Sequence, residues 1–317
     1  MTGFGSTAFT DPDSYPSSLM DADIRVVVTG CVAFGAQVSW LHMRYLRLWV
    51  IEEKAPRVAV IALPSSSLFV SFPLADSILV WNGVRLNRGD LVLHAPGDRF
   101  HQRTTGAARW GLISISPDDL KRYVRTLLDA DPTTGSAQLF RPSAHSSAAL
   151  LRLQLQAARL ARTKPTLLAR REVRRGLEQE LIHALVTGLG AAEAVCRPAW
   201  RRRATIMGRF EDALAAHDNS QPLSALCAEI GVPARTLRVC CAAYLGCSPL
   251  EYARLRRLNL ARLTLIKADP RATSVAEVAR SHGFSQPGRF AGAYRRLFGE
   301  APLTTLLRRK SISAESA

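Results

Sequence analysis

The first half of the chain alternates short apolar runs with turn residues. Between residues 24 and 116, β-branched and aromatic residues recur with a period of two, as in "IRVVV", "RVAVIAL" and "SLFVSF". Asn82-Gly83, within "ILVWNGVRL", supplies the two positive-φ residues of a tight hairpin turn. Many short strands with frequent turns predict a β-sandwich or small barrel. Residues 1–22, rich in Ser, Pro, Asp and Thr, are expected to form a loose lead-in.

After residue 116 the apolar positions follow a helical period. "SPDDLKRYVRTLLDA" opens with a helix start signal, and "DADPTTGSAQLFRPSAHSS" is expected to be a loop. Two longer helical patterns follow at 148–162 and 166–189, separated at Lys164-Pro165. The second carries an apolar stripe made of Leu177, Leu181, Ala184 and Leu185. The stripe could pack on the barrel of the same chain or on a second subunit, and we expect it to contribute to dimerisation.

Near the end of the chain, "SVAEVARSHGFSQPGRFAGAYRRLFGEAP" predicts two helices separated by a tight turn. Ser274 can cap the first helix, Gly283 suits a left-handed turn, and Ser285 can cap the second helix. The second helix leaves three arginines outside, namely Arg289, Arg295 and Arg296. This order predicts a helix-turn-helix whose second helix enters a major groove of DNA.

The same order occurs about fifty residues earlier, in "PLSALCAEIGVPARTLRVCCAAYLGCSPLEY". Gly231 lies at its turn, and Arg235 and Arg238 face outward on its second helix. Between the two units, "LEYARLRRLNLARLTLIKA" predicts an amphipathic linking helix. A helix of some seventeen residues is about 25 Å long. Successive major grooves lie about 34 Å apart, so both second helices could reach neighbouring grooves.

The charge is uneven along the chain. Residues 197–317 carry 20 Lys and Arg against 9 Asp and Glu, whereas residues 1–150 carry 14 against 13. A near-neutral half joined to a basic half favours a sensor or an enzyme tethered to a domain that meets polyanions. A globular domain with an arginine-rich face is the alternative.

The cysteines show neither a CxxC pair nor a histidine at zinc spacing. All six are expected to be buried reduced thiols: Cys31, Cys196, Cys227, Cys240, Cys241 and Cys247. The N-terminus lacks a basic region followed by an apolar run, and eighteen apolar residues never occur together. We therefore expect a cytoplasmic protein with no membrane partner.

About a third of the chain, residues 205–310, resembles the DNA-binding domain of the AraC/XylS family of bacterial transcription regulators. The matching signature is "RLRRLNLARLTLIKADPRATSVAEVARSHGFSQPGRFAGAYRRLFGEAP". "NRGDLVLHAPGDRFHQR" resembles more loosely the Gly-Asp…Pro-Gly…His stretch of the cupin-like sensor domain often attached in this family. The resemblance implies a sequence-specific transcription regulator. Its implied partners are double-stranded operator or promoter DNA, RNA polymerase, a small-molecule effector bound in the N-terminal domain and a second copy of the chain.

The predicted fold class is α+β multidomain. A cupin-like β-barrel or sandwich with a helical dimerisation segment precedes an all-α domain, in which a linking helix joins two helix-turn-helix units. The expected divisions are 1–22 (lead-in), 23–145 (sensor), 146–195 (dimerisation segment), 196–204 (linker), 205–310 (DNA-binding domain) and 311–317 (tail).

The resemblance implies that the outward residues early in each second helix meet base edges. These are Ala234, Arg235, Thr236, Arg238 and Val239 in the first unit and Pro287, Gly288, Arg289 and Gly292 in the second. Arg235 and Arg238 are candidates for contacts with guanine O6 and N7. In the second unit only Arg289 has reach, because two positions are glycine, so most discrimination is expected from the first. Three arginines are expected to hold phosphates: Arg254, Arg295 and Arg296.

A barrel with a mouth can hold a small ligand. Candidate wall residues are Trp81, His94, Phe100, His101, Arg103 and Trp110, although strand packing explains the aromatic residues as well. A cupin-type metalloenzyme with a DNA-targeting tail is an alternative function. However, His94 and His101 are seven residues apart, and the close His-x-His pair with a following Glu is absent. We expect no catalytic residue, metal or cofactor. A nonspecific architectural DNA binder is a third reading.

Overall fold

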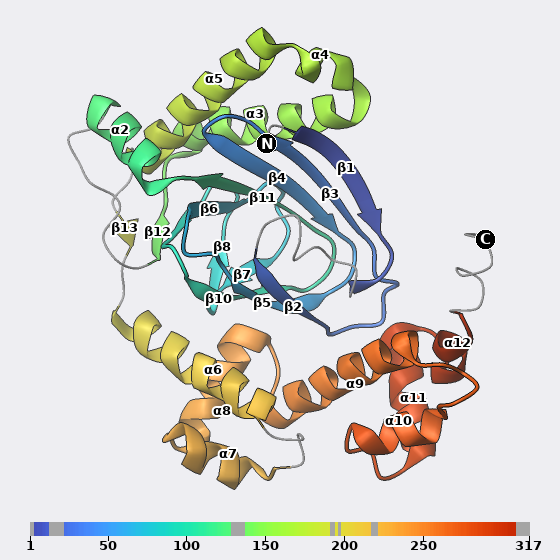
Figure 1. The fold of residues 1–317 in the computed structure, drawn as a ribbon. Coiled ribbons are helices and arrows are strands. Elements are labelled where there is room, and N and C mark those ends of the chain that lie inside the picture. Colours follow the sequence, from blue (N-terminus) through green and yellow to red (C-terminus); the bar gives the residue numbers. More distant parts are fainter. Residues whose placement is uncertain are drawn as a thin grey trace.

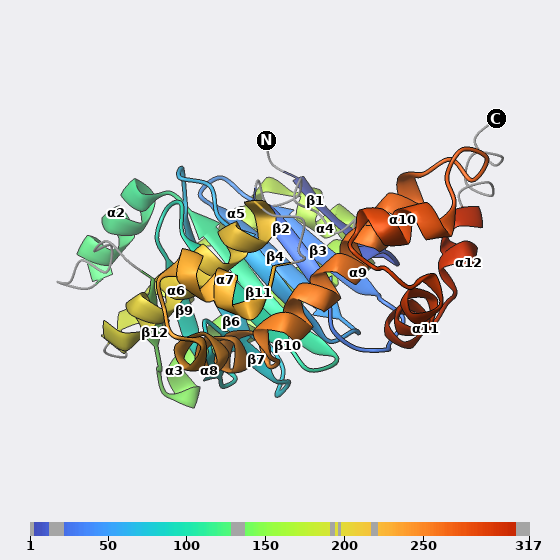
Figure 2. The same cartoon turned by 90° about the horizontal axis from the view of Figure 1, so that it is seen from below.

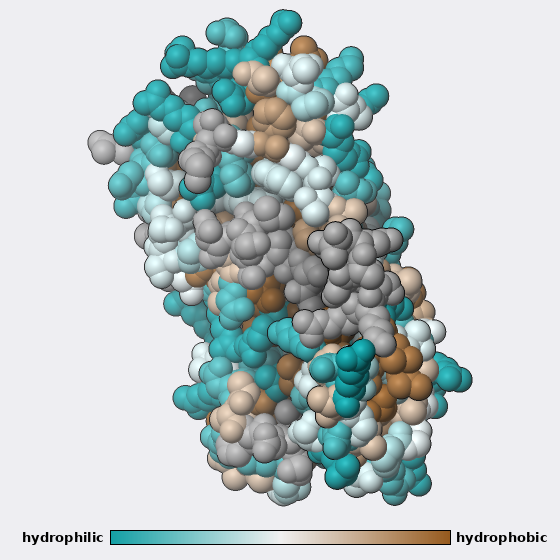
Figure 3. Space-filling view, turned by 45° about the vertical axis from the view of Figure 1, so that its right-hand side comes forward, coloured by the Kyte–Doolittle hydropathy of each residue, from teal (hydrophilic) through white to brown (hydrophobic). Residues whose placement is uncertain are grey.

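The computed structural model describes residues 3–12, 22–127, 137–190, 194–195, 198–216 and 221–308. Strands fill the first half and helices the last hundred residues, and the two halves lie against each other (Figure 1). Helices α3 (Ala144–Thr163) and α5 (Arg171–Gly190) cover the side of the strands that faces away from the helical half. On the face in Figure 3, hydrophobic areas are interrupted by hydrophilic residues in both halves.

The described strands form two sheets in which neighbouring strands are antiparallel. The orders are β1-β3-β4-β11-β6-β9-β12-β13 in the larger sheet and β2-β5-β10-β7-β8 in the smaller one. The strands are β1 (Gly3–Phe9), β2 (Asp23–Val28), β3 (Ala36–His42), β4 (Leu46–Glu53), β5 (Arg57–Ala62), β6 (Leu68–Pro73), β7 (Leu79–Trp81), β8 (Val84–Leu86), β9 (Leu91–His94), β10 (Arg99–Thr104), β11 (Ala108–Ile115), β12 (Gln138–Phe140) and β13 (Ala194–Val195).

Strand β4 shows how the larger sheet is buried on both faces. Its side chains alternate, so that Trp49 and Ile51 enter the core between the two sheets, while Leu48 and Val50 enter a second core beneath helices α3 and α5. A stretch covered on both faces needs apolar residues at consecutive positions, which explains the unbroken run from Leu48 to Ile51. The N-terminal half, called the barrel below, is therefore a sandwich of two sheets with a helical layer on one side.

The hairpin turn predicted at Asn82-Gly83 is confirmed. Both residues have positive φ, 45° and 78°, and they connect β7 to β8. The Asn82 side-chain oxygen accepts a hydrogen bond from the backbone N–H of His101 at 2.9 Å, which ties the turn to β10. Local sequence and tertiary contact therefore favour the same turn.

Four strands depart from the sequence expectations, among them β13 at the end of the expected dimerisation segment. Gly3–Phe9, within the expected lead-in, forms β1 and pairs with β3. Strand β10 was not among the predicted runs, and β12 lies inside the expected loop. The residues of β1 and β12 are glycine-rich or few, and they become strands because neighbouring strands supply their hydrogen bonds, which the local pattern does not reveal.

Helix α5 is fixed to the barrel of its own chain. The predicted stripe packs into the core beneath the larger sheet, where Leu181 and Leu185 are fully buried. The buried Glu178 side chain accepts hydrogen bonds from the backbone N–H groups of Tyr45 and Leu46 at 2.6 and 3.0 Å. Helices α2 (Pro117–Leu127) and α4 (Pro165–Ala169) complete this layer, and the predicted break at Lys164-Pro165 is present. Dimerisation through this segment stays a prediction.

The C-terminal half consists of helices within the described residues. They are α6 (Pro198–Ala216), α7 (Leu223–Ile230), α8 (Ala234–Leu245), α9 (Pro249–Lys267), α10 (Val275–Ser281), α11 (Pro287–Phe298) and α12 (Pro302–Leu307). Residues 198–204, expected to be a linker, form the first turns of α6. The expected tail, 311–317, lies outside the described residues. None of the described helices is long and apolar enough to cross a membrane.

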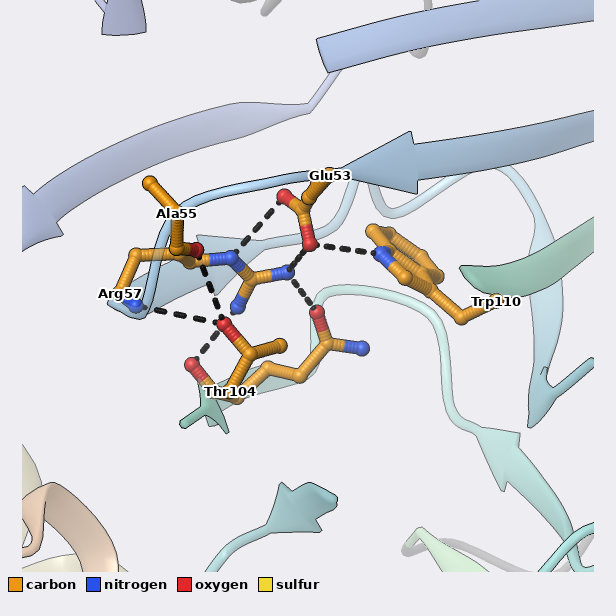
Figure 4. Close-up of polar contacts among 6 residues, drawn as sticks. Glu53, Ala55, Arg57, Thr104 and Trp110 are labelled. Carbon is orange, nitrogen blue, oxygen red and sulfur yellow. Dashed lines mark hydrogen bonds and ion pairs between the residues drawn. The ribbon is translucent and has the colours of Figure 1, made fainter. Parts of the chain in front are cut away.

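A buried ion pair joins the ends of β4 and β5 (Figure 4). The Arg57 guanidinium donates to both carboxylate oxygens of Glu53, at 3.0 and 2.7 Å, and also to the side chain of Gln102. The Trp110 ring N–H donates to the same carboxylate at 3.1 Å. A buried charge is tolerated when it is paired and hydrogen-bonded, as both charges are here.

The expectation that every cysteine is buried was wrong for Cys31, which is exposed. Cys227, Cys240 and Cys241 are buried in the helical half, and Cys247 is half-buried. Burial raises the pKa of the Cys240 and Cys241 thiols, and that of Cys247 to about 11. These thiols therefore stay protonated at neutral pH. Cys196 lies outside the described residues.

Candidate nucleic-acid interface

Unit 1, the first helix-turn-helix, consists of α7 and α8. Gly231 ends α7 in a left-handed conformation, with φ of 75°, as its place at the predicted turn requires. Helix α8 buries one face against α6, α7 and α9. The buried residues of this face are Leu237, Cys240, Cys241, Tyr244 and Leu245. The small side chain of Cys241 is fully buried, so the fold accommodates a thiol at this position.

Unit 2 consists of α10 and α11. Ser274 caps α10 through a capping box, in which the Ser274 hydroxyl accepts from the Glu277 N–H and the Glu277 carboxylate accepts from the Ser274 N–H. Gly283, with φ of 74°, makes the turn. The expected cap Ser285 was one residue early, because α11 begins after Gln286, whose side chain makes no capping bond. Phe284 packs against Phe290 with ring centroids 5.0 Å apart.

Helix α9 joins the two units and contacts both. It has 19 residues, starts with a Ser248 cap and ends at Lys267. Arg256 donates to the backbone oxygen of Leu214 in α6, and Arg257 donates to that of Gly283 in the turn of unit 2. In Figure 2, α8 lies at one end of α9 and α11 lies near its other end. The linking helix is thus a common support for both second helices.

The predicted base-contacting residues of unit 1 lie at the surface of α8. Arg235 and Arg238 are exposed, Val239 is 52% exposed, and Ala234 and Thr236 are half-buried. An aliphatic side chain exposed to that extent beside two arginines gives α8 both hydrogen-bond donors and a methyl surface. Such a helix can meet guanine through its arginines and a thymine methyl through its valine.

The corresponding face of α11 carries few side chains. Pro287, Gly288 and Arg289 are exposed, and Gly292 is half-buried. A Cβ added at Gly288 would meet nothing within 4 Å, and one at Gly292 would meet only the end of Arg296 at 3.8 Å. Packing therefore does not require glycine at either position. The two glycines simply leave the outer face of α11 with few side chains.

The predicted phosphate-contacting residues Arg254, Arg295 and Arg296 are all exposed. Among the described residues, none of the six arginines assigned to DNA forms an ion pair with a carboxylate, whereas Arg262 and Arg308 nearby do. Arg254 and Arg296 line a shallow groove of about 190 Å³ between α9, α11 and the barrel loop at Thr29 and Gly30. The guanidinium groups are therefore available to an external anion.

Sequence reasoning missed the contact between the barrel and the helical half. The Arg99 guanidinium and the Asp212 carboxylate are 2.7 Å apart, and the His101 ring and Glu211 are 3.3 Å apart. Glu211 also accepts from the Tyr252 hydroxyl at 2.7 Å. Burial alone would raise the Glu211 pKa, but hydrogen bonding and charge from His101 and the bond from Tyr252 lower it overall. The adjacent acids at 211–212, in a basic region, are the one signal that could have indicated this contact.

The predicted ligand-wall residues are packed rather than arranged around one cavity. His94 stacks on Phe100 with centroids 4.0 Å apart and hydrogen-bonds Ser71, and Trp81 packs edge-on against His94. Trp110 bonds Glu53 as described, while His101 and Arg103 face the helical half. A groove of about 540 Å³ instead lies at one end of the barrel, lined in part by Phe9, Phe34, Glu52, Lys54 and Arg109. That these six residues line a ligand pocket stays a prediction.

No group of three or more potential metal-ligating side chains (His, Cys, Asp or Glu) occurs among the described residues. His94 contacts Asp98 at 3.1 Å, and His101 contacts Glu211, so the two histidines have different partners. The arrangement brings the paired arginines of α8 to the surface, and it does not bring the two histidines to a common site.

Comparisons with known proteins centre on the helical half. Residues 226–308 match a protein family described as "Helix-turn-helix domain". The crystal structure of the AraC-like transcriptional activator CuxR aligns with 83% of this chain and 96% of its own, at 16% identity and a TM-score of 0.41.

Two curated proteins match the same region. The probable thc operon regulatory protein of Rhodococcus erythropolis is 39% identical over 93 residues, which are 29% of this chain and 28% of that protein. XylDLEGF operon transcriptional activator 1 of Pseudomonas putida is 45% identical over 65 residues, 20% of each chain. The chain thus spans only 20–28% of the length of these relatives. Their match to the signature and the geometry of the two units place residues 226–308 among the helix-turn-helix domains of the AraC/XylS family.

Proposed function

We propose that the protein is a sequence-specific DNA-binding transcription regulator of the AraC/XylS type. The observation that carries the proposal is the pair of helix-turn-helix units on one linking helix, with exposed arginines on both second helices that have no carboxylate partner among the described residues. The names of the two curated relatives, an operon regulatory protein and an operon transcriptional activator, support it.

The length of α9 is compatible with two neighbouring major grooves. Its 19 residues span about 28 Å at 1.5 Å per residue. Successive grooves on one face of DNA are about 34 Å apart, and the widths of the helices on either side supply much of the difference. Any remaining shortfall would favour bent DNA, at a cost on the order of a few kcal/mol.

Recognition then divides between bases and backbone. Arg235 and Arg238 would read guanine edges, and Arg254, Arg295 and Arg296 would hold phosphates. Because each neutralised phosphate releases counterions, binding should weaken steeply as salt rises. The exposed Val239 would add contact with a thymine methyl group.

A small molecule bound to the barrel would control DNA binding by favouring one arrangement of the two halves. The groove of about 540 Å³ at the end of the barrel, with aromatic side chains beside both acidic and basic groups, could accept a small polar molecule with an apolar part. Pairing of two chains and contact with RNA polymerase belong to the same proposal.

The test is to recover and sequence the genomic DNA fragments that the purified protein retains, with and without candidate metabolites. We expect a small set of fragments that share a two-part motif, and a change in retention with one metabolite. Equal retention of all fragments at every salt concentration would contradict sequence-specific regulation and would favour a nonspecific architectural binder.

A further inference from the structure

The end of strand β2 lies where α9 passes from unit 1 to unit 2. Val27 and Val28 are consecutive, so their side chains point to opposite faces of the strand. Val27 joins the core of unit 1, whose members include Met207, Phe210, Leu237, Tyr244 and Tyr252. Val28 joins the core of unit 2, whose members include Leu258, Leu265, Phe290 and Tyr294. One strand of the barrel thus contributes a buried valine to each DNA-binding unit.

Asn259 on α9 holds the end of this strand. Strand β2 is at the edge of its sheet, and Val28 turns its N–H and C=O away from the neighbouring β5. The Asn259 side chain accepts from the Val28 N–H at 3.0 Å and donates to the Val28 oxygen at 3.2 Å. It also donates to the Leu255 oxygen of its own helix at 2.8 Å. A single buried amide thus satisfies the open edge of β2 and orients α9 against it.

The same stretch of α9 carries two arginines that bind neighbouring elements. Arg256 reaches α6, the helix that supports unit 1, through the Leu214 oxygen, and Arg257 reaches unit 2 through the Gly283 oxygen. The Arg257 guanidinium also lies over the Phe284 ring, 5.0 Å from its centroid. Within four residues, 256–259, the linking helix therefore contacts α6, unit 2 and the barrel.

The two units depend on this junction unequally. Unit 1 and its supporting helix α6 have further barrel contacts, including the Arg99–Asp212 pair and the packing of Tyr244 beside Gly83. On the side of unit 2, the described residues add Arg262 on α9, 3.8 Å from Asp11, and Phe34, which packs against the core of unit 2. A shift of β2 against α9 would therefore move α11 relative to α8, because unit 1 stays attached to the barrel.

We propose that Asn259, together with the Val27–Val28 end of β2, sets the distance and angle between the two recognition helices. Asn259 is a positioning residue for the proposed DNA-binding function, on which this inference rests. It contacts no DNA itself, and it determines which separation of the two DNA segments the chain accepts. The barrel thereby takes part in sequence selection without touching a base.

The experiment compares binding to duplexes that differ only in the spacing of the two segments. The full-length protein first selects its preferred duplex from a random library, and one or two base pairs are then inserted between the segments. Each inserted base pair moves the second segment by about 3.4 Å and turns it by about 35°. For the unaltered protein we expect a loss of roughly fivefold to hundredfold, equivalent to one bidentate base contact.

Asn259→Ala should flatten this dependence, so that the inserted duplexes bind within about threefold of the original, less than the loss of one bidentate contact. Asn259→Asp keeps the acceptor for the Val28 N–H and loses both donors, so it should give an intermediate profile and serves if the alanine variant unfolds. Thr264→Ala is the matched control: its hydroxyl is also on α9 and bonds His282 at 2.8 Å within the helical half. It should leave the spacing profile unchanged.

A loss of affinity for Asn259→Ala that is equal at every spacing would overturn the positioning role and leave the proposed function intact. A random library from which the unaltered protein selects no sequence would overturn the proposed function itself. Thermal unfolding of each variant separates a change in stability from a change in the ratio between spacings, since lost folded protein lowers all affinities alike.

Discussion

The two helix-turn-helix units share one plan and differ in what they present to the outside. Helix α8 of unit 1 exposes Arg235, Arg238 and Val239, whereas the matching part of α11 exposes Arg289 between two glycines. Neither glycine is required by packing. On the proposed function, this difference predicts that α8 supplies most of the base discrimination and that α11 supplies little.

The units also differ in what stabilises them. Unit 1 has a core of thiols and leucines that continues into the barrel through Val27 and Val58. Unit 2 takes one buried valine, Val28, from the barrel. It is otherwise stabilised by the capping box at Ser274 and by a row of tilted rings formed by Phe284, Phe290, Tyr294 and Phe298. We therefore expect changes in the barrel to alter the stability of unit 1 more strongly than that of unit 2.

The largest effect should come from the reading side chains of unit 1. The double substitution Arg235→Ala and Arg238→Ala removes two candidate contacts worth about 1–3 kcal/mol each. Affinity for the selected duplex, measured by titration at fixed salt, should fall by roughly 30-fold or more. Arg235→Ala alone should relax the base preference at one position. A larger loss for Arg289→Ala, or equal losses on selected and random duplexes, would contradict the division between the units.

A smaller and uniform effect is expected from Arg296→Ala on α11. This exposed guanidinium is assigned to a phosphate, so its loss should weaken selected and random duplexes by the same factor. The slope of log K against log salt should become shallower by about 0.9. A loss confined to the selected duplex would instead make Arg296 a base-reading residue.

The dependence of unit 1 on the barrel can be tested at the tip of the β7–β8 hairpin. Gly83 has positive φ, and an added Cβ would lie 2.9 Å from the Tyr244 ring on α8. Gly97 is the control, since it also has positive φ but would meet only the Ser65 hydroxyl, at 3.3 Å. Both alanine variants should lose about 1 kcal/mol or more of folding free energy in urea unfolding. Only Gly83→Ala should also weaken DNA binding, and equal DNA affinities would refute the coupling.

The independence of unit 2 can be tested at its cap. Ser274→Ala removes the capping box and should cost about 1 kcal/mol, measured by urea unfolding. Ser285→Ala is the matched control, because Ser285 precedes the first turn of α11 without capping it, and it should change stability by less than about 0.5 kcal/mol. A larger loss of stability for Ser285→Ala than for Ser274→Ala would mean that α11 uses Ser285 as its cap.

The smallest effect concerns pH and the turn of unit 2. Burial lowers the pKa of His282, so the folded state favours the neutral ring. Its contribution to stability is complete above the unfolded pKa, about 6.5, and is lost as pH falls through the lower folded value. His282→Gln should therefore reduce the decline of the melting temperature between neutral and mildly acidic pH. His145→Gln, an exposed histidine on α3, should leave that decline as it is.

Local signals explain what the sequence could predict. The turns at Gly231 and Gly283, the cap at Ser274 and the hairpin at Asn82-Gly83 each depend on residues within a few positions of one another, and all four are present. Because the helix-turn-helix order occurs twice, the sequence also predicted the helix that links the two units. For the candidate site, the pattern predicted the exposed arginines because charged positions alternate with a regular apolar face.

Features that depend on distant residues were not predictable in this way. Strand β1 forms only because β3 lies beside it, and the pairing of His101 with Glu211 joins residues 110 positions apart. His101 was a candidate for a ligand wall within the cupin-like stretch, and its side chain contacts Glu211 on α6. The role of Asn259 was equally hidden, since an asparagine in a helix carries no sign of the strand it meets.

Val27 of β2 and Val58 of β5 pack in the core of unit 1, and this has a consequence for producing either half of the chain alone. Val27 and Val58 are 6% and 0% exposed because the helical half covers them. Expressing residues 198–308 alone would uncover the matching apolar surface on α6, α8 and α9, and such surfaces promote self-association. A soluble fragment should therefore need polar replacements on that surface, and a barrel produced without its partner half should need the same at Val27 and Val58.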